Sequence, residues 1–176
     1  FHGSASFTYT ISDGTGGTDT ATVTITVKSA DKMGDWLAAH HLTTATPDED
    51  SDGDSISNAI EYVIGGNPAN TPDNFRLPTA GMVSLEKDGT PTEYLCFTYP
   101  RSDLANTDSA ATITAEWAPD LSGTWTPADE THGELIQVED QPGENFDWVK
   151  VFVPRSLSST GVLMVRLRVV MERVTE

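Results

Sequence analysis

Carboxylate and amide side chains crowd one short segment of the sequence, DEDSDGDSISNAIE, which runs from Asp48 to Glu61. Oxygen atoms at this density suit Ca²⁺, which takes about six to eight oxygen ligands at roughly 2.3 to 2.6 Å. In an EF-hand loop of about twelve residues the ligands stand at positions 1, 3, 5, 7, 9 and 12, because alternate side chains converge on one point only in a tightly turned loop. The segment therefore predicts a calcium site.

Two registers of this loop compete. If Asp48 takes position 1, position 12 falls on Ala59, which has no carboxylate. If Asp50 takes position 1, every ligand position carries an oxygen donor, and position 12 is a glutamate that arrives from the following helix. We therefore predict that the ligands are the side chains of Asp50, Asp52, Asp54, Asn58 and Glu61 and the backbone carbonyl of Ile56.

One position departs from the EF-hand pattern. Position 6, usually glycine because of its backbone conformation, is Ser55 here, and we expect Gly53 to absorb the sharp turn. The alternative interpretation is a solvated acidic turn in which Ser57 or Asp54 merely caps the next helix. The regular spacing of the carboxylates favours calcium.

The same segment resembles the thrombospondin type 3 and dockerin-like loops written D-x-D-G-D-G-x-S-N-x-x-E-Y. Ser55 departs from that pattern, and the matching residues are Asp50, Asp52, Gly53, Asp54, Ser57, Asn58, Glu61 and Tyr62. In exported bacterial proteins such a loop often precedes a C-terminal β-domain with W-S-x-D-L-x-x-W. The chain is similar to that motif at Trp117, Asp120, Leu121 and Trp125, with Ala118 and Pro119 in place of the usual small polar pair.

Other residues that could do chemistry lack a recognisable pattern. His40 and His41 are adjacent, so on a helix they point about 100° apart and do not readily share a metal. His2 and His132 have no neighbouring cysteine or acidic spacing typical of a zinc site. Because no nucleophile-elbow, zinc-protease or P-loop motif is present, we expect the chain not to be an enzyme.

Two groups of residues allow two interpretations each. Asp13 and Asp19 either shape a polar turn, which we favour, or bind a second calcium ion. Aromatic side chains either pack in a core, which we also favour, or form an exposed platform that stacks sugars. These aromatic residues are Tyr94, Tyr99, Trp117, Trp125 and Trp148.

Charge excludes some partners. The 176 residues include 10 Lys and Arg against 27 Asp and Glu, which gives a net charge of −17. Such a surface repels phosphate, so we expect no nucleic acid partner.

The sequence has no apolar run of the roughly 18 to 20 residues that cross a membrane. A single cysteine, Cys96, cannot form an internal disulfide. Because the sequence begins with Phe1, we expect a processed or excised piece of a longer protein.

The elements that position these residues are mainly strands. Residues 4–27 alternate apolar and polar side chains on both sides of a glycine-rich turn, which predicts a β-hairpin. This stretch resembles the last two strands of the cadherin-like, immunoglobulin-type repeats of large bacterial surface proteins, S-F-x-Y-x-[IV]-x-D-G-x-G-G-x-D-x-A-x-V-x-[IV]-x-V. We assign residues 1–29 to this partial sandwich, so strands from elsewhere must cover its apolar face.

The remaining chain predicts three further parts. An EF-hand-like helix-loop-helix occupies residues 30–68, with Gly65 and Gly66 ending the second helix, and a linker spans 69–80. Residues 81–176 predict a C-terminal antiparallel β-sandwich. Its strands are expected at 82–87, 92–99, 110–117, 133–139, 146–153 and 162–170.

Together these patterns predict a mainly β, calcium-binding, non-catalytic structural or adhesive module of an extracellular or cell-surface protein. Its expected partners are neighbouring β-domains or copies of itself, with filament assembly by strand addition through the hairpin as one form of this interaction. The alternative is a carbohydrate- or protein-binding, dockerin-like accessory module of a secreted enzyme. We expect no membrane insertion.

Overall fold

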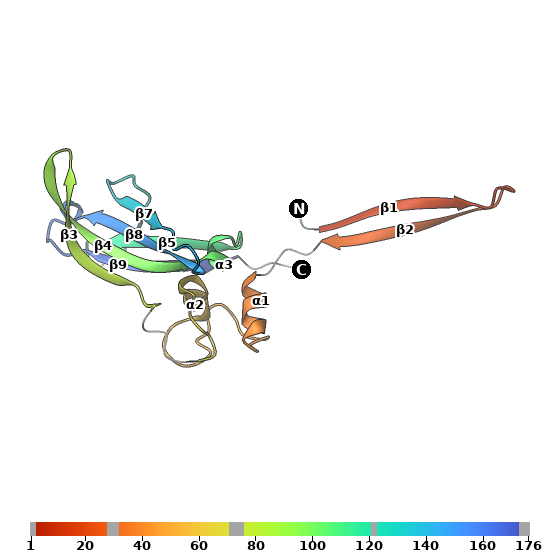
Figure 1. Cartoon of the computed structure of the whole chain (residues 1–176), viewed down its shortest axis with the longest axis horizontal. Coiled ribbons are helices and arrows are strands. Elements are labelled where there is room, and N and C mark those ends of the chain that lie inside the picture. The colour runs from red at the N-terminus through yellow and green to blue at the C-terminus, as the bar shows by residue number, and fades with distance from the viewer. Residues whose placement is uncertain (1–2, 28–31, 71–75, 121–122, 173–176) are drawn as a thin grey trace. The chain divides into compact units, whose positions relative to one another are not determined.

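The computed structural model describes residues 3–27, 32–70, 76–120 and 123–172. The described chain divides into two compact units, one within the first 31 residues and one that begins at Lys32. Both units are built mainly from antiparallel strands, which form three sheets (Figure 1). The predicted mainly β fold is therefore confirmed.

The first unit is the predicted hairpin. Strand β1 (Gly3–Ser12) pairs with β2 (Thr18–Val27) in a register that places Phe7 opposite Val23 and Tyr9 opposite Ala21. The apolar side chains of one face remain in solvent within this unit, because Phe7 is 54% exposed and Tyr9 is 49% exposed. A two-stranded sheet of this kind buries little apolar surface by itself.

The second unit contains a two-layer β-sandwich. Its larger sheet has four antiparallel strands in the order β3 (Thr79–Lys87), β4 (Thr90–Ser102), β8 (Phe146–Pro154) and β7 (Leu135–Glu139). Its smaller sheet has three, in the order β6 (Thr126–Pro127), β5 (Ala111–Ala118) and β9 (Met164–Met171). A short 3₁₀ helix, Arg155–Leu157, follows β8.

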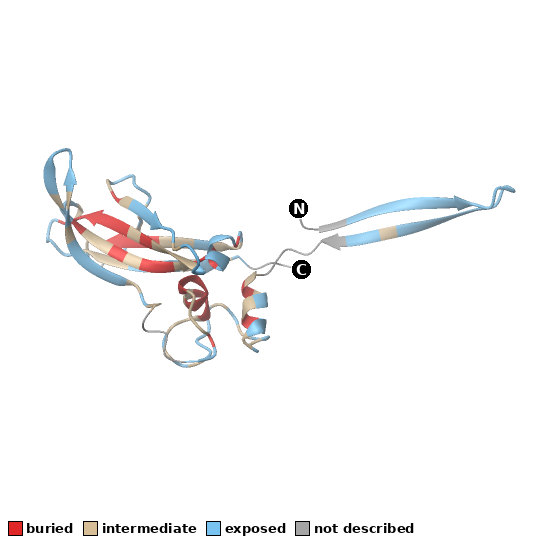
Figure 2. Cartoon of the chain, viewed as in Figure 1, coloured by how far each residue is buried: buried red, intermediate tan, exposed pale blue. Residues whose placement is uncertain are grey.

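The core between the two sheets follows from the alternation of the strands. Phe97 lies opposite Val151 and Tyr99 lies opposite Val149 in the β4–β8 pairing, so these side chains share one face. They pack with Trp117 of β5 and form one buried cluster. In Figure 2, buried positions lie along the strands of the sandwich. Burial of these apolar side chains is the main force that holds the two sheets together.

Three short helices pack at one end of the sandwich. They are α1 (Lys32–Ala39), α2 (Asn58–Ile64) and α3 (Asp103–Asn106). Met33 and Leu37 of α1, Tyr62 and Val63 of α2 and Ala105 of α3 form a second buried cluster, which also contacts Val169 and Met171 of β9. The acidic loop between α1 and α2 is thus anchored at both ends (Figure 1).

The C-terminal end of α2 matches the prediction. Gly65 follows the last helical residue with a φ of 72°, and its N–H donates to the Glu61 carbonyl. A left-handed residue at this position favours glycine because it has no Cβ.

The predicted strands of the sandwich are all present, with small shifts at their ends. Strand β3 begins at Thr79, inside the segment that was predicted as a linker, and residues 71–75 of that segment lie outside the described residues. The pattern did not indicate β6 or α3, because each is too short to show a period.

We predict that Phe97→Ala lowers the free energy of unfolding by about 3 to 5 kcal/mol, because it leaves a cavity between the sheets. The matched change Val138→Ala, at a side chain of β7 that is 49% exposed, should shift it by less than about 0.5 kcal/mol. Urea unfolding of the two variants measures both values. Equal effects would contradict a core at this place.

Candidate cation-binding loop

The structure brings together three of the predicted ligands. Asp50, Asp52 and Asp54 each place a carboxylate oxygen within 4.8 Å of the others. Asp50 is exposed, and Asp52 and Asp54 are half-buried. Like charges at this spacing repel one another, so a cation among them would remove an unfavourable interaction.

The turn of the loop is organised around the carboxylate of Asp50. Its Oδ1 accepts from the Gly53 N–H at 2.8 Å, and its Oδ2 accepts from the Ser55 N–H at 2.8 Å. The Asp54 N–H lies 3.2 Å from Asp50 Oδ1 and 3.2 Å from Asp52 Oδ1. The backbone therefore curls around the first ligand residue, which is the curvature that convergent alternate ligands require.

Two residues of this turn adopt left-handed backbone conformations. Gly53 has a φ of 83°, as the sequence predicted for the sharp turn, and Ser55 has a φ of 74°. Ser55 stands at position 6 of the predicted register, where EF-hand loops carry an invariant glycine for the same reason. The backbone geometry thus supports Asp50 as position 1, although the side chain at position 6 departs from consensus.

The same hydrogen bonds tune the charge of Asp50. The Ser55 N–H, together with those of Gly53 and Asp54, lowers the pKa of the Asp50 carboxyl below 3.8, although burial opposes the shift. Because the pKa of Asp50 is lower in the folded state than in the unfolded state, its ionised carboxylate stabilises the fold. This stabilisation is complete above pH 3.8 and is lost as the pH falls through the pKa of the folded state. Asp50 is therefore fully ionised near neutral pH and available to a cation.

Capping of α2 is done by other groups. Ser57 precedes the helix but makes no side-chain capping bond. Instead the Asn58 N–H donates to the Glu49 carbonyl at 2.8 Å, and the Ala59 N–H donates to the Pro47 carbonyl at 2.9 Å. Backbone carbonyls thus take the capping role that the alternative interpretation gave to Ser57 or Asp54.

The later ligand positions lie on or beside α2. The N–H of Ile56 donates to Asp54 Oδ1 at 2.9 Å, immediately before the helix. Asn58 is fully buried, and its Nδ2 donates to the Thr46 carbonyl at 2.8 Å. Its Oδ1 accepts no hydrogen bond within the described part of the chain. Because the amide is fixed through its nitrogen, its oxygen stays available for a ligand.

Glu61 is also fully buried. It is not one of the three residues whose ligand atoms lie within 4.8 Å of one another. Buried carboxylates in proteins are typically paired or coordinate metals. The structure therefore gathers the first half of the predicted ligand set and places Asn58 and Glu61 on the helix that follows.

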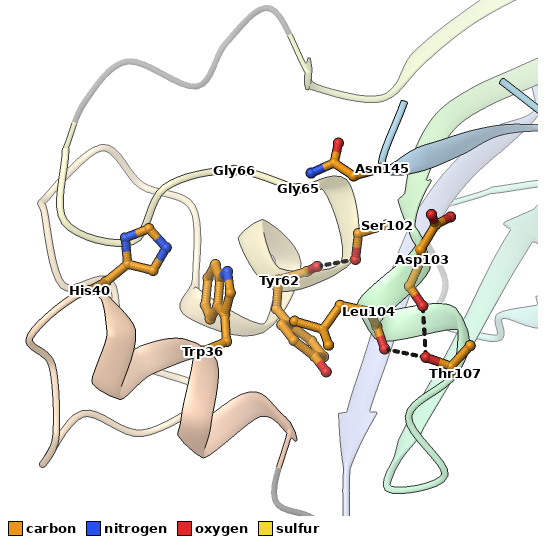
Figure 3. A pocket seen from close by; sticks show the side chains of 10 residues that line it. All are labelled: Trp36, His40, Tyr62, Gly65, Gly66, Ser102, Asp103, Leu104, Thr107 and Asn145. Atoms are coloured by element: carbon orange, nitrogen blue, oxygen red, sulfur yellow. Dashed lines mark hydrogen bonds between the residues drawn. The ribbon is translucent and has the colours of Figure 1, made fainter. Parts of the chain in front are cut away.

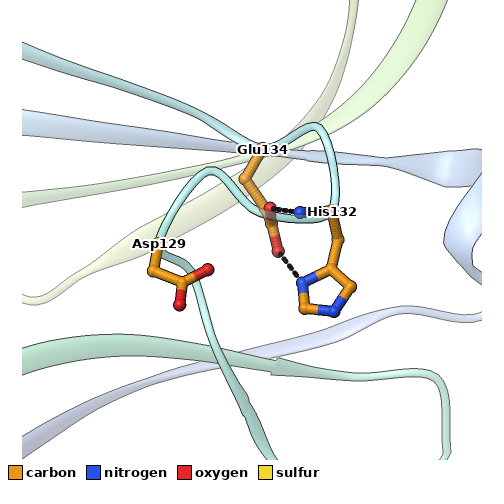
Figure 4. Close-up of side chains that lie close together, drawn as sticks. All are labelled: Asp129, His132 and Glu134. Carbon is orange, nitrogen blue, oxygen red and sulfur yellow. Dashed lines mark hydrogen bonds and ion pairs between the residues drawn. The ribbon is translucent and has the colours of Figure 1, made fainter.

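A second cluster of possible ligands lies in the loop from β6 to β7. Asp129, His132 and Glu134 each place a ligand atom within 4.8 Å of the others (Figure 4). Sequence reasoning missed this group, since it found no acidic spacing typical of zinc around His132. The signal was present as D-x-x-H-x-E, but the burial of Glu134 could not be read from so short a pattern.

A pocket of about 560 Å³ lies between the helices and the end of β4. Trp36 stands edge-on to His40 and to Tyr62, with ring centroids 5.2 and 5.3 Å apart (Figure 3). His40 is half-buried and His41 is exposed. The polar lining of the pocket includes His40, Ser102 and Asp103, and the Ser102 hydroxyl donates to the Tyr62 carbonyl at 2.7 Å.

Most of the aromatic side chains that the alternative sugar platform would need are not exposed at the surface. Tyr94, Tyr99 and Trp117 are buried, which confirms core packing for these three. Trp125 is half-buried and lies under the Arg166 guanidinium at 4.2 Å. Of the motif around these tryptophans, Leu121 lies outside the described residues.

In the hairpin, Asp13 shapes the turn. Its Oδ1 accepts from the Thr15 N–H at 2.8 Å and from the Gly17 N–H at 2.9 Å. These bonds, those of Thr15 first, lower the pKa of the Asp13 carboxyl. The polar-turn interpretation of Asp13 therefore fits the structure. Asp19 Oδ1 accepts from the neighbouring Thr20 N–H at 2.9 Å.

Comparison with known proteins adds one finding. A family model described as a bacterial Ig domain matches residues 1–26, which agrees with the resemblance of the hairpin to the end of an immunoglobulin-type repeat. No curated protein and no solved structure matches the chain. Among the described residues, no helix has both the length and the apolar character needed to cross a membrane.

The left-handed Ser55 yields a test of the loop geometry. We predict that Ser55→Gly raises the free energy of unfolding by about 1 kcal/mol, because the left-handed conformation is costly for residues with a Cβ. Ser51→Gly, in the same loop but not in that conformation, should give no such gain. Urea unfolding in calcium-free buffer compares them, and equal shifts would contradict the left-handed conformation at Ser55.

Proposed function

We propose that the loop from Asp50 to Glu61 binds Ca²⁺ and that the chain is a non-catalytic structural module of an extracellular or cell-surface protein. The observation that carries this proposal is the convergence of the Asp50, Asp52 and Asp54 carboxylates within 4.8 Å in a loop whose backbone has left-handed residues at two positions. Ca²⁺ fits better than a transition metal because the predicted ligands are all oxygen atoms.

Several features of the loop support calcium over a solvated turn. The N-terminus of α2 is capped by the carbonyls of Pro47 and Glu49, so the acidic side chains are not needed for that role. The buried Oδ1 of Asn58, at position 9, accepts no hydrogen bond from any residue that the structure describes. Glu61, a fully buried carboxylate on α2, would complete the set from position 12.

The ion would act by tying two packed helices together. The loop joins α1 to α2, and both helices pack against β9 through one apolar cluster. Any ligand that binds only the folded state stabilises it by mass action, about 2.7 kcal/mol when its concentration is a hundred times the dissociation constant. Calcium outside the cell is abundant enough to fill sites of modest affinity.

Thermal melting with added calcium tests this proposal. We predict that calcium raises the melting midpoint of the intact chain and that a chelator reverses the rise. Asp50→Asn and Glu61→Gln should abolish the calcium response, because each removes a charged ligand. Asp48→Asn, an exposed acidic residue of the same segment that is a ligand only in the rejected register, should leave the response intact.

Two outcomes would contradict this proposal. A midpoint that does not move with calcium would remove the ion from the loop. Loss of the response in Asp48→Asn with retention in Glu61→Gln would assign the other register.

The hairpin supports a second part of the proposal. An immunoglobulin-type sandwich has about seven strands, whereas the hairpin is a two-stranded sheet with a solvent-exposed apolar face on Phe7, Tyr9 and Ile25. We propose that strands of a second copy of the chain complete this sheet by strand addition, which would build a filament. The open backbone edges of β1 and β2 provide the hydrogen-bonding groups.

Light scattering after gel filtration tests assembly through the hairpin. We predict that the intact chain associates, and that deletion of residues 1–27 or the change Phe7→Ser yields monomers. Thr8→Ala, on the polar face of the same strand, should leave association unchanged. Association that survives the deletion would contradict strand addition, and an intact chain that stays monomeric at every concentration would assign the missing strands to another β-domain.

Alternative functions have less support. A sugar-binding module would need exposed aromatic faces, whereas Tyr94, Tyr99 and Trp117 are buried. A dockerin-like adaptor would carry a pair of calcium loops, whereas this sequence has one loop of that pattern. A calcium-stabilised structural module therefore accounts for more of the described residues.

A further inference from the structure

The cluster of Asp129, His132 and Glu134 is chemically different from the acidic loop. It contains one imidazole nitrogen and two carboxylates, and it lies in the loop that crosses from β6 of the smaller sheet to β7 of the larger sheet. Nitrogen and oxygen ligands in this proportion suit a borderline divalent metal such as Zn²⁺. Ca²⁺ prefers a larger number of oxygen ligands.

Glu134 provides the fixed point of the cluster. Its side chain is 0% exposed. Its Oε1 accepts from the Trp117 Nε1–H at 2.7 Å, and its Oε2 accepts from the His132 backbone N–H at 2.7 Å. Each oxygen has a second lone pair, so both hydrogen bonds can persist when a metal binds. Such partners behind a metal-binding carboxylate orient it and raise affinity.

The charge of Glu134 is incompletely balanced. In the part of the chain that the structure describes, His132 is the only basic side chain within ion-pair distance of it. The His132 side chain is 48% exposed, so solvent weakens its interaction with Glu134. A buried carboxylate is stabilised by a cation placed beside it.

The spacing of the two inner ligand atoms fits a tetrahedral metal. His132 Nδ1 lies 3.4 Å from Glu134 Oε1, which is long for a hydrogen bond. Zinc–ligand distances of about 2.0 to 2.2 Å place two ligands of a tetrahedron about 3.3 to 3.6 Å apart. The imidazole ring and the carboxylate already face one another at that separation (Figure 4).

Asp129 approaches from the opposite arm of the loop (Figure 4). Its Oδ1 accepts from the Thr131 hydroxyl at 2.6 Å and from the Thr131 N–H at 3.2 Å. Both bonds come from Thr131, so they fix the position of the Asp129 carboxylate in the loop. The same hydroxyl lies 2.9 Å from His132 Nδ1, so Thr131 links Asp129 to His132.

We propose that Asp129, His132 and Glu134 bind Zn²⁺ or a chemically similar divalent metal, with water in the fourth position. The ion would fasten the crossing loop to Trp117 of β5, because Glu134 is bonded to that indole. The site would therefore stabilise the connection between the two sheets. It is independent of the proposed calcium loop in sequence and in ligand type.

Calorimetric zinc titration of the intact chain in saturating calcium tests this site, since calcium occupies the acidic loop. We predict one zinc site and a change in tryptophan fluorescence, because Trp117 is bonded to Glu134 and its ring centroid lies 5.9 Å from that of His132. His132→Asn and Asp129→Asn should each weaken binding by about tenfold or more. His41→Asn, at an exposed histidine outside the cluster, should leave binding unchanged.

Folding of the variants is checked by thermal melting without metal. His132 and Asp129 are exposed, so their variants should melt near the wild-type temperature. Zinc affinity that is the same in wild type and His132→Asn would overturn the proposal. So would loss of binding in His41→Asn, or zinc binding that saturating calcium abolishes.

Discussion

Repulsion among three carboxylates in one short loop is the constraint on which the proposed function depends. Asp50, Asp52 and Asp54 converge within 4.8 Å although each carries the same charge. The backbone N–H groups of Gly53, Asp54 and Ser55 hold the first of them in place, at the cost of a left-handed conformation at Ser55. The proposed cation would offset both the repulsion and the backbone strain.

The surrounding elements are arranged so that this loop is held at both ends. Leu37 of α1 and Tyr62 of α2 pack in the same apolar cluster, and Val169 of β9 covers them. The Tyr62 hydroxyl donates to Asp108 at 2.9 Å, and the Tyr62 carbonyl accepts from the Ser102 hydroxyl at 2.7 Å. These bonds attach α2 to the sandwich at buried positions. An ion in the loop would therefore act on the stability of the whole second unit and not on the loop alone.

The parts of the structure that the sequence predicted well are those that local patterns determine. Alternation of apolar and polar residues located the hairpin, in which Phe7 lies opposite Val23, and most strands of the sandwich, because successive side chains of a strand point to opposite faces. Spacing alone located the acidic loop, and Gly65 located the end of α2. These signals involve residues within about one turn or one strand of each other.

The parts that it missed depend on distant contacts. Glu134 is buried because it bonds to Trp117, 17 residues away on a strand of the other sheet. Capping of α2 by the carbonyls of Pro47 and Glu49 leaves no mark on side-chain types. The two groups of possible ligands therefore differ in how they could be found. The spacing of the residues in the sequence indicates the acidic loop at Asp50, whereas only the fold reveals the cluster around Glu134.

A net charge of −17 gives both clusters the same electrostatic background, in which cations are the natural ligands. The most direct measurement is a crystal structure of the chain grown with calcium, with anomalous scattering used to locate the ion. The calcium assignment predicts an ion at about 2.3 to 2.6 Å from oxygens of Asp50, Asp52, Asp54 and Glu61 and from the Ile56 carbonyl. Carboxylates that point into water, with no anomalous density among them, would contradict it.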